Sequence, residues 1–439
     1  MFQTLKNAFK VKEIRVKIWM TLLFILIYRL GCYIPVPGIG GELISNAELN
    51  KVSYLGIMSM MTGGSLANGT WLAMGISPYI NASIIIQLLT VAIPTLERIS
   101  KTGEEGQKKI NNMTRIGALL LAVIQSIGIL LSFNTSIKEG TDTALSLSAL
   151  LGNQVWLAYA LVVIVYASGA LVTVWIGERI TEYGVSNGIS ILIFVGILST
   201  AGQYFISMIT TTFGNGGNLV EFWKLIGYIV ALVVIFGGIV WVELAERRIP
   251  VQYAKQVKGR KMYGGQSTVI PIKVNANGVM PLIFAFSILS FPELIMTMFW
   301  PNSNATQWWQ QWMGTQSWVY MVVLCLLILF FAFFYSQIQF NAEDISKTIQ
   351  SNGGYILGYR PGRPTMEYLN KVQKRITLFG AIFLAIMALV PSIIFRLIDP
   401  GTSSVFSATG MLICVSVALE FNTALESQVM MKNYKGFLK

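Results

Sequence analysis

The chain contains no histidine, and only 12% of its 439 residues are charged. Without histidine, it has no imidazole general base, no histidine metal ligand and no histidine-based pH switch. Soluble domains carry about 25% charged residues, so a water-soluble enzyme of this size is excluded. Cysteine is scarce as well. Cys32, Cys325 and Cys414 are far apart and form no CxxC pair, so we predict no disulfide framework, no metal site and no cofactor.

Apolar residues make up 54% of the chain and recur in long runs from one end to the other, which excludes disorder. A helix needs about 20 apolar residues to cross a bilayer. Ten segments meet this requirement: 17–34, 72–93, 116–133, 155–176, 189–209, 225–242, 278–299, 317–340, 376–397 and 406–425. We therefore expect an all-α membrane protein with ten transmembrane helices.

The positive charges are distributed unevenly between the two sides of this arrangement. An even number of spans places both termini on one side, and 27 of the 32 Lys and Arg residues fall on that side. Positive residues stay cytoplasmic, so we expect both termini in the cytoplasm and the chain in the cytoplasmic membrane. No small-residue cleavage site follows the first span, which we interpret as a retained helix.

Ten spans divide into two halves of five, residues 1–212 and 213–439, separated by a polar loop. Because each half has an odd number of spans, the second half enters the membrane from the opposite side. The second span of each half opens with the pattern G-x-x-P-x-I, at 75–80 and at 278–283. Paired Gly/Pro interruptions mark a pathway between inverted repeats. They also occur by chance, since both residues are common in membrane helices.

Few charges lie in the spans that would line such a pathway. The spans are nearly bare of charge, with Arg29, Glu293 and Glu420 lying near the ends of three of them. Ion-coupled carriers use buried ionisable groups, so the scarcity favours a channel whose apolar constriction excludes water. The alternative is an inverted-repeat secondary transporter that binds a small solute through Arg29, Gln87 and Gln125; a structural scaffold is a more distant third.

A short apolar segment at 54–64 ends in Gly63 and Gly64 and cannot span the membrane. It fits either an interfacial or re-entrant helix on the outer face, or a mobile stopper over a pore, flexibly attached through the two glycines.

Two predicted cytoplasmic loops, 243–277 and 341–375, are long and basic. Positive-inside bias and attraction to anionic lipids account for charge in such loops. Lipid attraction does not require the glycines, prolines and aromatic residues that surround Arg360. An ordered tip presenting this side chain indicates a partner with phosphate or carboxylate groups, either ribosomal RNA or an acidic motor protein.

The sequence resembles the SecY family, whose members form the central subunit of the bacterial protein-conducting translocon. The similarity covers nearly the whole chain. It includes YRLG at 28–31, IPVPG at 34–38, SPYINASIIIQL at 77–88, GERITE at 177–182, NGIS at 187–190, the run from 266 to 275, GVMP at 278–281 and RPG at 360–362.

The resemblance implies two five-helix halves around a central pore that passes unfolded secretory polypeptides and releases membrane segments sideways into lipid. It implies a pore ring of Ile76, Ile80, Ile189, Ile193, Ile283 and Ile413. It implies a plug at about 54–68, with Tyr54, Leu55, Ile57, Met58, Met60, Met61, Gly63 and Gly64. The lateral gate would lie between the second and seventh helices, beside the third and eighth, at Ile84, Gln87, Leu88, Gln125, Ser287 and Phe291.

The implied partners are the small membrane subunits SecE and SecG, the SecA motor ATPase, the ribosome, signal peptides with nascent chains, and anionic lipids. The docking positions would be Arg247, Arg248, Arg260, Lys261 and Arg360. Three positions depart from the family pattern. Lys261 replaces one residue of a basic pair and Met280 replaces a branched aliphatic residue, while Asn68 puts an electrostatic latch on the plug in doubt. Since the chain has no phosphate-binding GxxxxGK[ST] loop, we expect no enzymatic activity, and the driving force must come from outside.

Overall fold

The protein is described from a computed structural model. The structure describes residues 2–36, 53–138, 155–214, 219–253, 256–258, 261–263, 267–275, 278–300, 303–314, 317–398 and 408–436.

A helix occupies each of the ten segments predicted to cross the membrane. In the first half these are α2 (Lys12–Gly31), α5 (Ser77–Ala92), α7 (Glu104–Lys138), α9 (Val155–Tyr183) and α10 (Gly188–Gly214). In the second half they are α11 (Leu219–Glu243), α12 (Met280–Phe299), α14 (Trp318–Gln339), α16 (Arg363–Ile398) and α17 (Ala408–Gly436). Seven of the described helices are long and apolar enough to span a bilayer on their own.

An eighth span results if α5 is counted together with α6 (Pro94–Ser100), which follows it at an angle of 107°. The bend falls at Ile93, whose backbone is extended with φ −108° and ψ 112°. A residue before proline is disfavoured in the helical region, so Pro94 ends one helix and begins the next.

The two G-x-x-P-x-I segments adopt the same local geometry. Gly75 and Gly278 have φ of +51° and +58°, a region that favours glycine. The next residues, Ile76 and Val279, lie at φ −93° and −89° and act as the N-caps of α5 and α12. A proline then occupies the first helical turn, where its missing N–H costs nothing. The sequence repeat therefore marks two matched helix starts.

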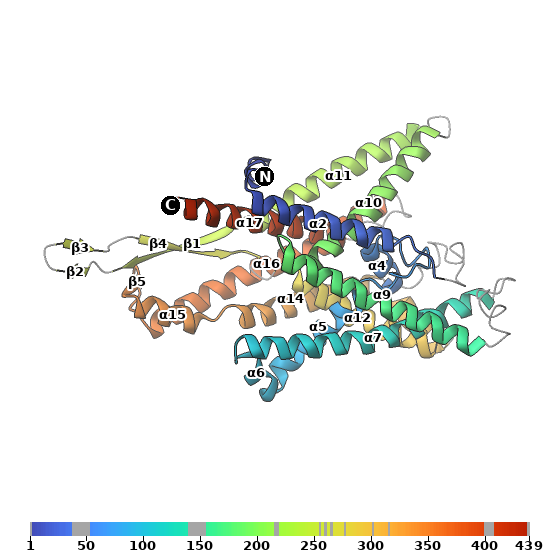
Figure 1. Cartoon of the computed structure of the whole chain (residues 1–439), viewed down its shortest axis with the longest axis horizontal. Coiled ribbons are helices and arrows are strands. Elements are labelled where there is room, and N and C mark those ends of the chain that lie inside the picture. Colours follow the sequence, from blue (N-terminus) through green and yellow to red (C-terminus); the bar gives the residue numbers. More distant parts are fainter. Residues whose placement is uncertain are drawn as a thin grey trace.

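Four shorter helices complete the helical part: α1 (Phe2–Lys10), α4 (Ser53–Thr62), α13 (Asn304–Met313) and α15 (Ala342–Ser351). α1 packs against α17 through an apolar cluster that includes Ala8, Leu425 and Val429. The first and last described helices therefore lie at the same end of the molecule (Figure 1).

At that end, the two long basic loops form a small β structure that an all-helical expectation does not include. The strands are β1 (Glu246–Tyr253), β2 (Gln256–Lys258), β3 (Lys261–Tyr263), β4 (Ser267–Lys273) and β5 (Gly354–Ile356). β4, β1 and β5 form one antiparallel sheet in that order, and β2 pairs with β3. Figure 1 shows the sheet and the β2–β3 pair projecting beyond the helices.

The helices pack around separate apolar clusters. One cluster joins α11, α12, α14, α16 and α17 with parts of α5 and α10. Another joins α4, α7 and α9. A third, here called the central cluster, draws side chains from α2, α4, α5, α9, α10, α12 and α17. Helices from both halves of the chain therefore meet in the central cluster.

Candidate functional site

The central cluster contains all six isoleucines predicted for the pore ring. Ile76, Ile193 and Ile413 are among its buried members. The other three, Ile80, Ile189 and Ile283, are partly buried and pack against them. These residues span more than 330 positions of sequence, yet they converge from the start of α5, the start of α10, the start of α12 and α17. Their assignment as a pore ring stays a prediction.

A cavity of about 60 Å³ borders this cluster on the side of α4. It is lined mainly by apolar side chains, among them Met60, Met61, Ile80, Ile283 and Ile413. Ser287 of α12, predicted for the lateral gate, also lines it. The cavity therefore lies where three sets of predicted residues, those of the ring, the plug and the gate, come together.

Helix α4 lies directly on the backbone of α10. Met58 and Met60 are buried, and the Thr200 hydroxyl donates a 3.1 Å hydrogen bond to the Met60 carbonyl oxygen. A Cβ built on Gly196 would lie only 1.9 Å from the carbonyl oxygen of Met61, so this close approach requires glycine. The side chains of Tyr54, Leu55 and Ile57 lie outside the described residues.

Gly63 and Gly64, which follow α4, have positive φ angles of 70° and 84°. The Arg29 guanidinium of α2 packs on Gly63 so closely that a Cβ there would lie 2.4 Å from its Nη1. Arg29 also donates a 3.2 Å hydrogen bond to the Val195 carbonyl oxygen of α10. In the sequence, the signal for this contact is a lone cation inside an apolar span, and no local pattern connects Arg29 with Gly63.

Residues predicted for the lateral gate lie on α5 and α12, two helices that share an apolar cluster and both line the cavity. Ile84 and Leu88 of α5 share an apolar cluster with Leu282 and Ala285 of α12. Helix α7 packs against both α5 and α12.

The polar residues predicted for the gate have different environments. Gln125 of α7 is 1% exposed, and its side-chain amide has no hydrogen-bond partner among the described residues. The Gln87 amide donates to Ser83 within its own helix at 3.5 Å. Phe291 of α12 is exposed. The arrangement places one buried, unsatisfied amide beside the two helices predicted to separate.

The predicted docking residues divide between the sheet and a neighbouring loop. Arg247 and Arg248 are exposed on β1, where the Arg248 Nε lies 2.7 Å from a carboxylate oxygen of Glu246. Arg260 and the side chain of Lys261 lie outside the described residues. Arg360 is exposed in the loop after β5. Because β5 pairs with β1, the two basic loops, about 100 residues apart in sequence, form a single surface.

The loop that presents Arg360 is held at several points. The Tyr359 and Tyr368 rings stack with centroids 4.1 Å apart. The Thr365 hydroxyl donates to the Arg360 carbonyl oxygen at 2.8 Å. On β5, the Tyr355 hydroxyl donates to the Gln252 side chain of β1 at 2.9 Å. The ordered tip expected around Arg360 is therefore present in the structure.

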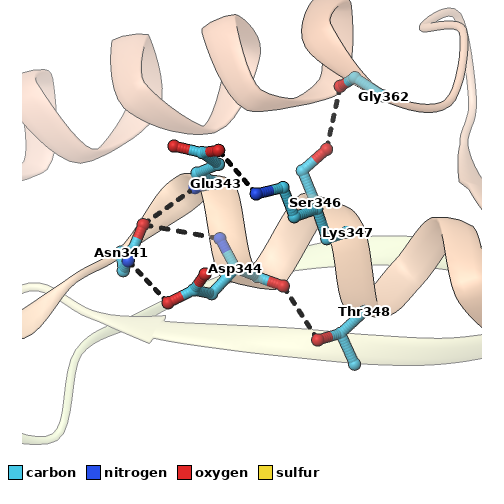
Figure 2. A network of polar contacts seen from close by, with 7 residues as sticks. All are labelled: Asn341, Glu343, Asp344, Ser346, Lys347, Thr348 and Gly362. Atoms are coloured by element: carbon cyan, nitrogen blue, oxygen red, sulfur yellow. Dashed lines mark hydrogen bonds and ion pairs between the residues drawn. The ribbon is translucent and has the colours of Figure 1, made fainter. Parts of the chain in front are cut away.

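Helix α15 supports the same loop from the other side, as Figure 2 shows. The Asn341 side chain caps the helix by accepting from the backbone N–H groups of Glu343 and Asp344. From the first half of the helix, the Ser346 hydroxyl donates to the Gly362 carbonyl oxygen at 2.8 Å. Gly362 lies two residues after Arg360, so the capped helix anchors the tip.

The exposed face of α15 carries an ion pair between Glu343 and Lys347, with a separation of 2.6 Å. The hydrogen bond from Lys347 lowers the pKa of the Glu343 carboxyl and raises the pKa of the Lys347 ammonium. The carboxylate therefore contributes stability near neutral pH that is lost as the pH falls through its lowered pKa. Such solvent-exposed pairs contribute little, so we expect only a weak effect.

Known proteins match this chain over nearly its whole length. The SecY family model matches residues 70–422. The protein translocase subunit SecY of Staphylococcus carnosus is 38% identical over 439 residues, covering 100% of this chain and 99% of that protein. The protein of the same name from Streptomyces coelicolor is 39% identical over 450 residues and is covered over its full length.

Solved structures share the fold at lower sequence identity. A structure described as a protein conducting channel has a TM-score of 0.64 at 17% identity and covers 94% of this chain and 92% of its own. Sec61 in the canine ribosome-channel complex has a TM-score of 0.61 at 16% identity, with the same coverage. A third solved structure, of a SecY protein whose plug domain is described as stabilising the closed state of the translocation channel, has a TM-score of 0.67.

Proposed function

The chain belongs to the SecY family of protein-conducting channels, and on that premise we propose that its pore is sealed by the six isoleucines of the central cluster. One observation carries the proposal: side chains from four separate helix segments meet in one apolar cluster that joins both halves of the chain. An apolar constriction resists hydration and so disfavours ion passage. It also offers no fixed hydrogen bonds, so it can fit around the varied side chains of a passing polypeptide.

Helix α4 serves as the plug that closes the pore at rest. Its support comes from the buried Met58 and Met60, the cavity beside the ring, and the close backbone contact with Gly196. Gly63 and Gly64 supply the flexible attachment, because glycine tolerates the large backbone changes that displacement requires. Arg29 holds the attachment in the resting position.

The lateral gate opens between α5 and α12. Its closed form is apolar at Ile84 and Leu88, whereas Gln125 supplies a buried amide whose hydrogen-bonding capacity is unused among the described residues. Separation of the helices exposes this amide to water or to a substrate chain, which offsets part of the cost of breaking the apolar contact.

The sheet surface and Arg360 serve as the docking site for the machinery that drives translocation, either a ribosome or the SecA motor. Signal peptides and nascent chains enter from this side. SecE and SecG bind alongside as small membrane subunits, and anionic lipids surround the basic loops.

In this arrangement both termini lie in the cytoplasm. Residues 1–212 and 213–439 form the two halves of the channel, and the chain itself performs no catalysis.

Site-specific crosslinking to a stalled export intermediate tests the pore. Photoreactive probes replace Ile80 and Ile283, and a third probe replaces the exposed Ile229 of α11 as the lipid-facing control. We expect both ring probes to crosslink to substrate positions that shift as the stall point moves, while the control stays silent. Silence at both ring positions, with the substrate crosslinked elsewhere, would contradict the ring assignment.

A further inference from the structure

Tryptophan side chains define two levels along the molecule that the channel assignment does not use. Trp19, Trp175 and Trp241 are exposed toward the ends of α2, α9 and α11 that lie nearest the sheet. At the opposite ends of the spans, exposed tryptophans occur near the start of α9, α11 and α14 and just after α12: Trp156, Trp223, Trp318 and Trp300. Tryptophan is enriched at both membrane–water interfaces, so these two levels mark the boundaries of the bilayer.

Helix α13 lies at the level farther from the sheet, because it connects the end of α12 to the start of α14. Its ten residues contain three tryptophans and no charged side chain. Ser303 caps its first turn by accepting from the Thr306 N–H. The helix is therefore well defined but too short to cross a membrane.

The side chains of α13 fall into three sectors. Thr306, Trp309 and Met313 face the protein: Thr306 is buried, Trp309 is half-buried, and Met313 packs on the cluster that contains α12 and α14. A second sector, with spacing i, i+3 and i+7, consists of Ala305, Trp308 and Trp312, all of them exposed. The fractional exposures of Trp308 and Trp312 are 58% and 48%.

The third sector, formed by Asn304, Gln307 and Gln311 with Gln310 beside it, is polar and exposed. A helix that contacts protein on one side, carries tryptophan on a second and amides on a third fits a position in the plane of a membrane interface. The next helix, α14, packs against α13, and its surface favours lipid as the occupant of the tryptophan sector. Along α14, Val322, Leu326 and Phe330 are exposed in one apolar row.

From this arrangement, we propose that α13 lies in the membrane interface on the side farther from the sheet, with Trp308 and Trp312 inserted at the headgroup–acyl boundary of a phospholipid bilayer. In this position α13 anchors the end of α12 to the lipid. An interfacial helix of this kind buries its apolar face about 5–10 Å into the boundary region.

Lipid-quenching measurements on the full chain, reconstituted in phosphatidylcholine–phosphatidylglycerol vesicles, test the proposal. Cys32, Cys325 and Cys414 are first replaced, and a single cysteine carrying the fluorophore NBD is introduced by Ala305→Cys. This position lies on the tryptophan sector and leaves both tryptophans intact. The matched control is Gln307→Cys, two residues away on the polar sector of the same helix.

We expect NBD at position 305 to emit at shorter wavelength than at 307 and to be quenched by nitroxide lipids, most strongly when the nitroxide lies near the headgroup. Adding Trp308→Ser and Trp312→Ser to the Ala305→Cys variant should reduce this quenching. Three results would overturn the proposal: a probe at 305 quenched by aqueous iodide but not by lipid, equal quenching at 305 and 307, or quenching unchanged by loss of both tryptophans. The first of these would assign the surface to water or to a protein partner instead.

Discussion

Gly196 is the residue on which the resting position of α4 depends most directly, since a side chain there would occupy the space of the Met61 carbonyl oxygen. The Met61 carbonyl belongs to the backbone, so it cannot move away from a new side chain as the end of a flexible side chain could. Gly202 lies on the same helix, and apart from its chain neighbours and the backbone of its own helix, no described atom is within 4 Å of a Cβ built there. The two glycines therefore form a matched pair for testing the plug.

We expect Gly196→Ala to displace α4 from α10 and to raise the ion conductance of the resting channel in planar bilayers. Overpacking of this kind costs about 1–3 kcal/mol, which corresponds to a shift of roughly 5- to 150-fold toward the displaced state. Gly202→Ala should leave the conductance unchanged. Equal conductance of the two variants would contradict the assignment of α4 as the plug.

A second prediction at this scale concerns the ring. Ile283→Asp should make the resting channel leaky, because an unpaired polar group in apolar surroundings costs about 2–7 kcal/mol and is relieved by drawing in water. Ile80→Asp should act in the same way from the other half. Ile283→Leu keeps the apolar volume and should seal normally. Single-channel recordings in planar bilayers measure all three variants, and a tight Ile283→Asp channel would remove Ile283 from the ring.

At the scale of elements, strand β1 connects the two basic loops. Val251 is fully buried in β1, with Thr268 of β4 on one side and Ile356 of β5 on the other. Val269 of β4 is 48% exposed. Replacing valine by aspartate at each of these two positions therefore distinguishes the effect of losing the sheet from the effect of adding a negative charge alone.

We expect Val251→Asp to detach β5 from β1 and destabilise the sheet by about 3 kcal/mol or more, as a buried unpaired charge does. Val269→Asp should cost less than about 0.5 kcal/mol. Limited proteolysis of the membrane-embedded protein measures the difference as faster cleavage near residues 254–266 and 353–362. Equal cleavage of both variants would show that the two loops are ordered independently.

The loop that presents Arg360 gives another prediction at this scale. Arg360→Glu should block motor-driven export, while the protein itself still inserts into the membrane, because the substitution reverses the charge offered to an anionic partner. Lys371→Glu makes the same charge change at an exposed position on α16 and should export normally. Export of a secretory precursor into inverted vesicles measures both. Normal export by the Arg360→Glu variant would end the docking proposal.

The elements differ in how far the sequence predicts them. The ten spans and the two matched helix starts follow from apolar length and from the G-x-x-P-x-I pattern, which act locally. Strand β5 was missed because it has only three residues and pairs with a strand about 100 positions earlier. The same limit applies to the site. The family resemblance predicts Ile76 and Ile413 as ring residues, and both lie in the central cluster, but the packing of Arg29 on Gly63 depends on the tertiary structure.

At the scale of the whole molecule, the orientation in the membrane is open to a direct test. In a cysteine-free background, Gln310→Cys on α13 should react with a membrane-impermeant maleimide added to intact cells. Lys347→Cys on α15 should react only after the cells are opened, because positive residues stay inside. Both side chains are exposed, so accessibility within the protein is matched. The reverse pattern would invert the predicted topology.

The base of the sheet is fixed to one set of helices. The Val274 N–H donates to the Ala245 carbonyl oxygen at 2.9 Å. Beside it, Glu243 of α11 accepts hydrogen bonds from Asn275 at 2.8 Å and from Ser416 of α17 at 2.6 Å. The projecting strands therefore act as a lever arm whose fulcrum lies on α11 and α17. A load at the tip is transmitted to α11 and α17, and through Ile413 and Val417 of α17 it reaches the central cluster.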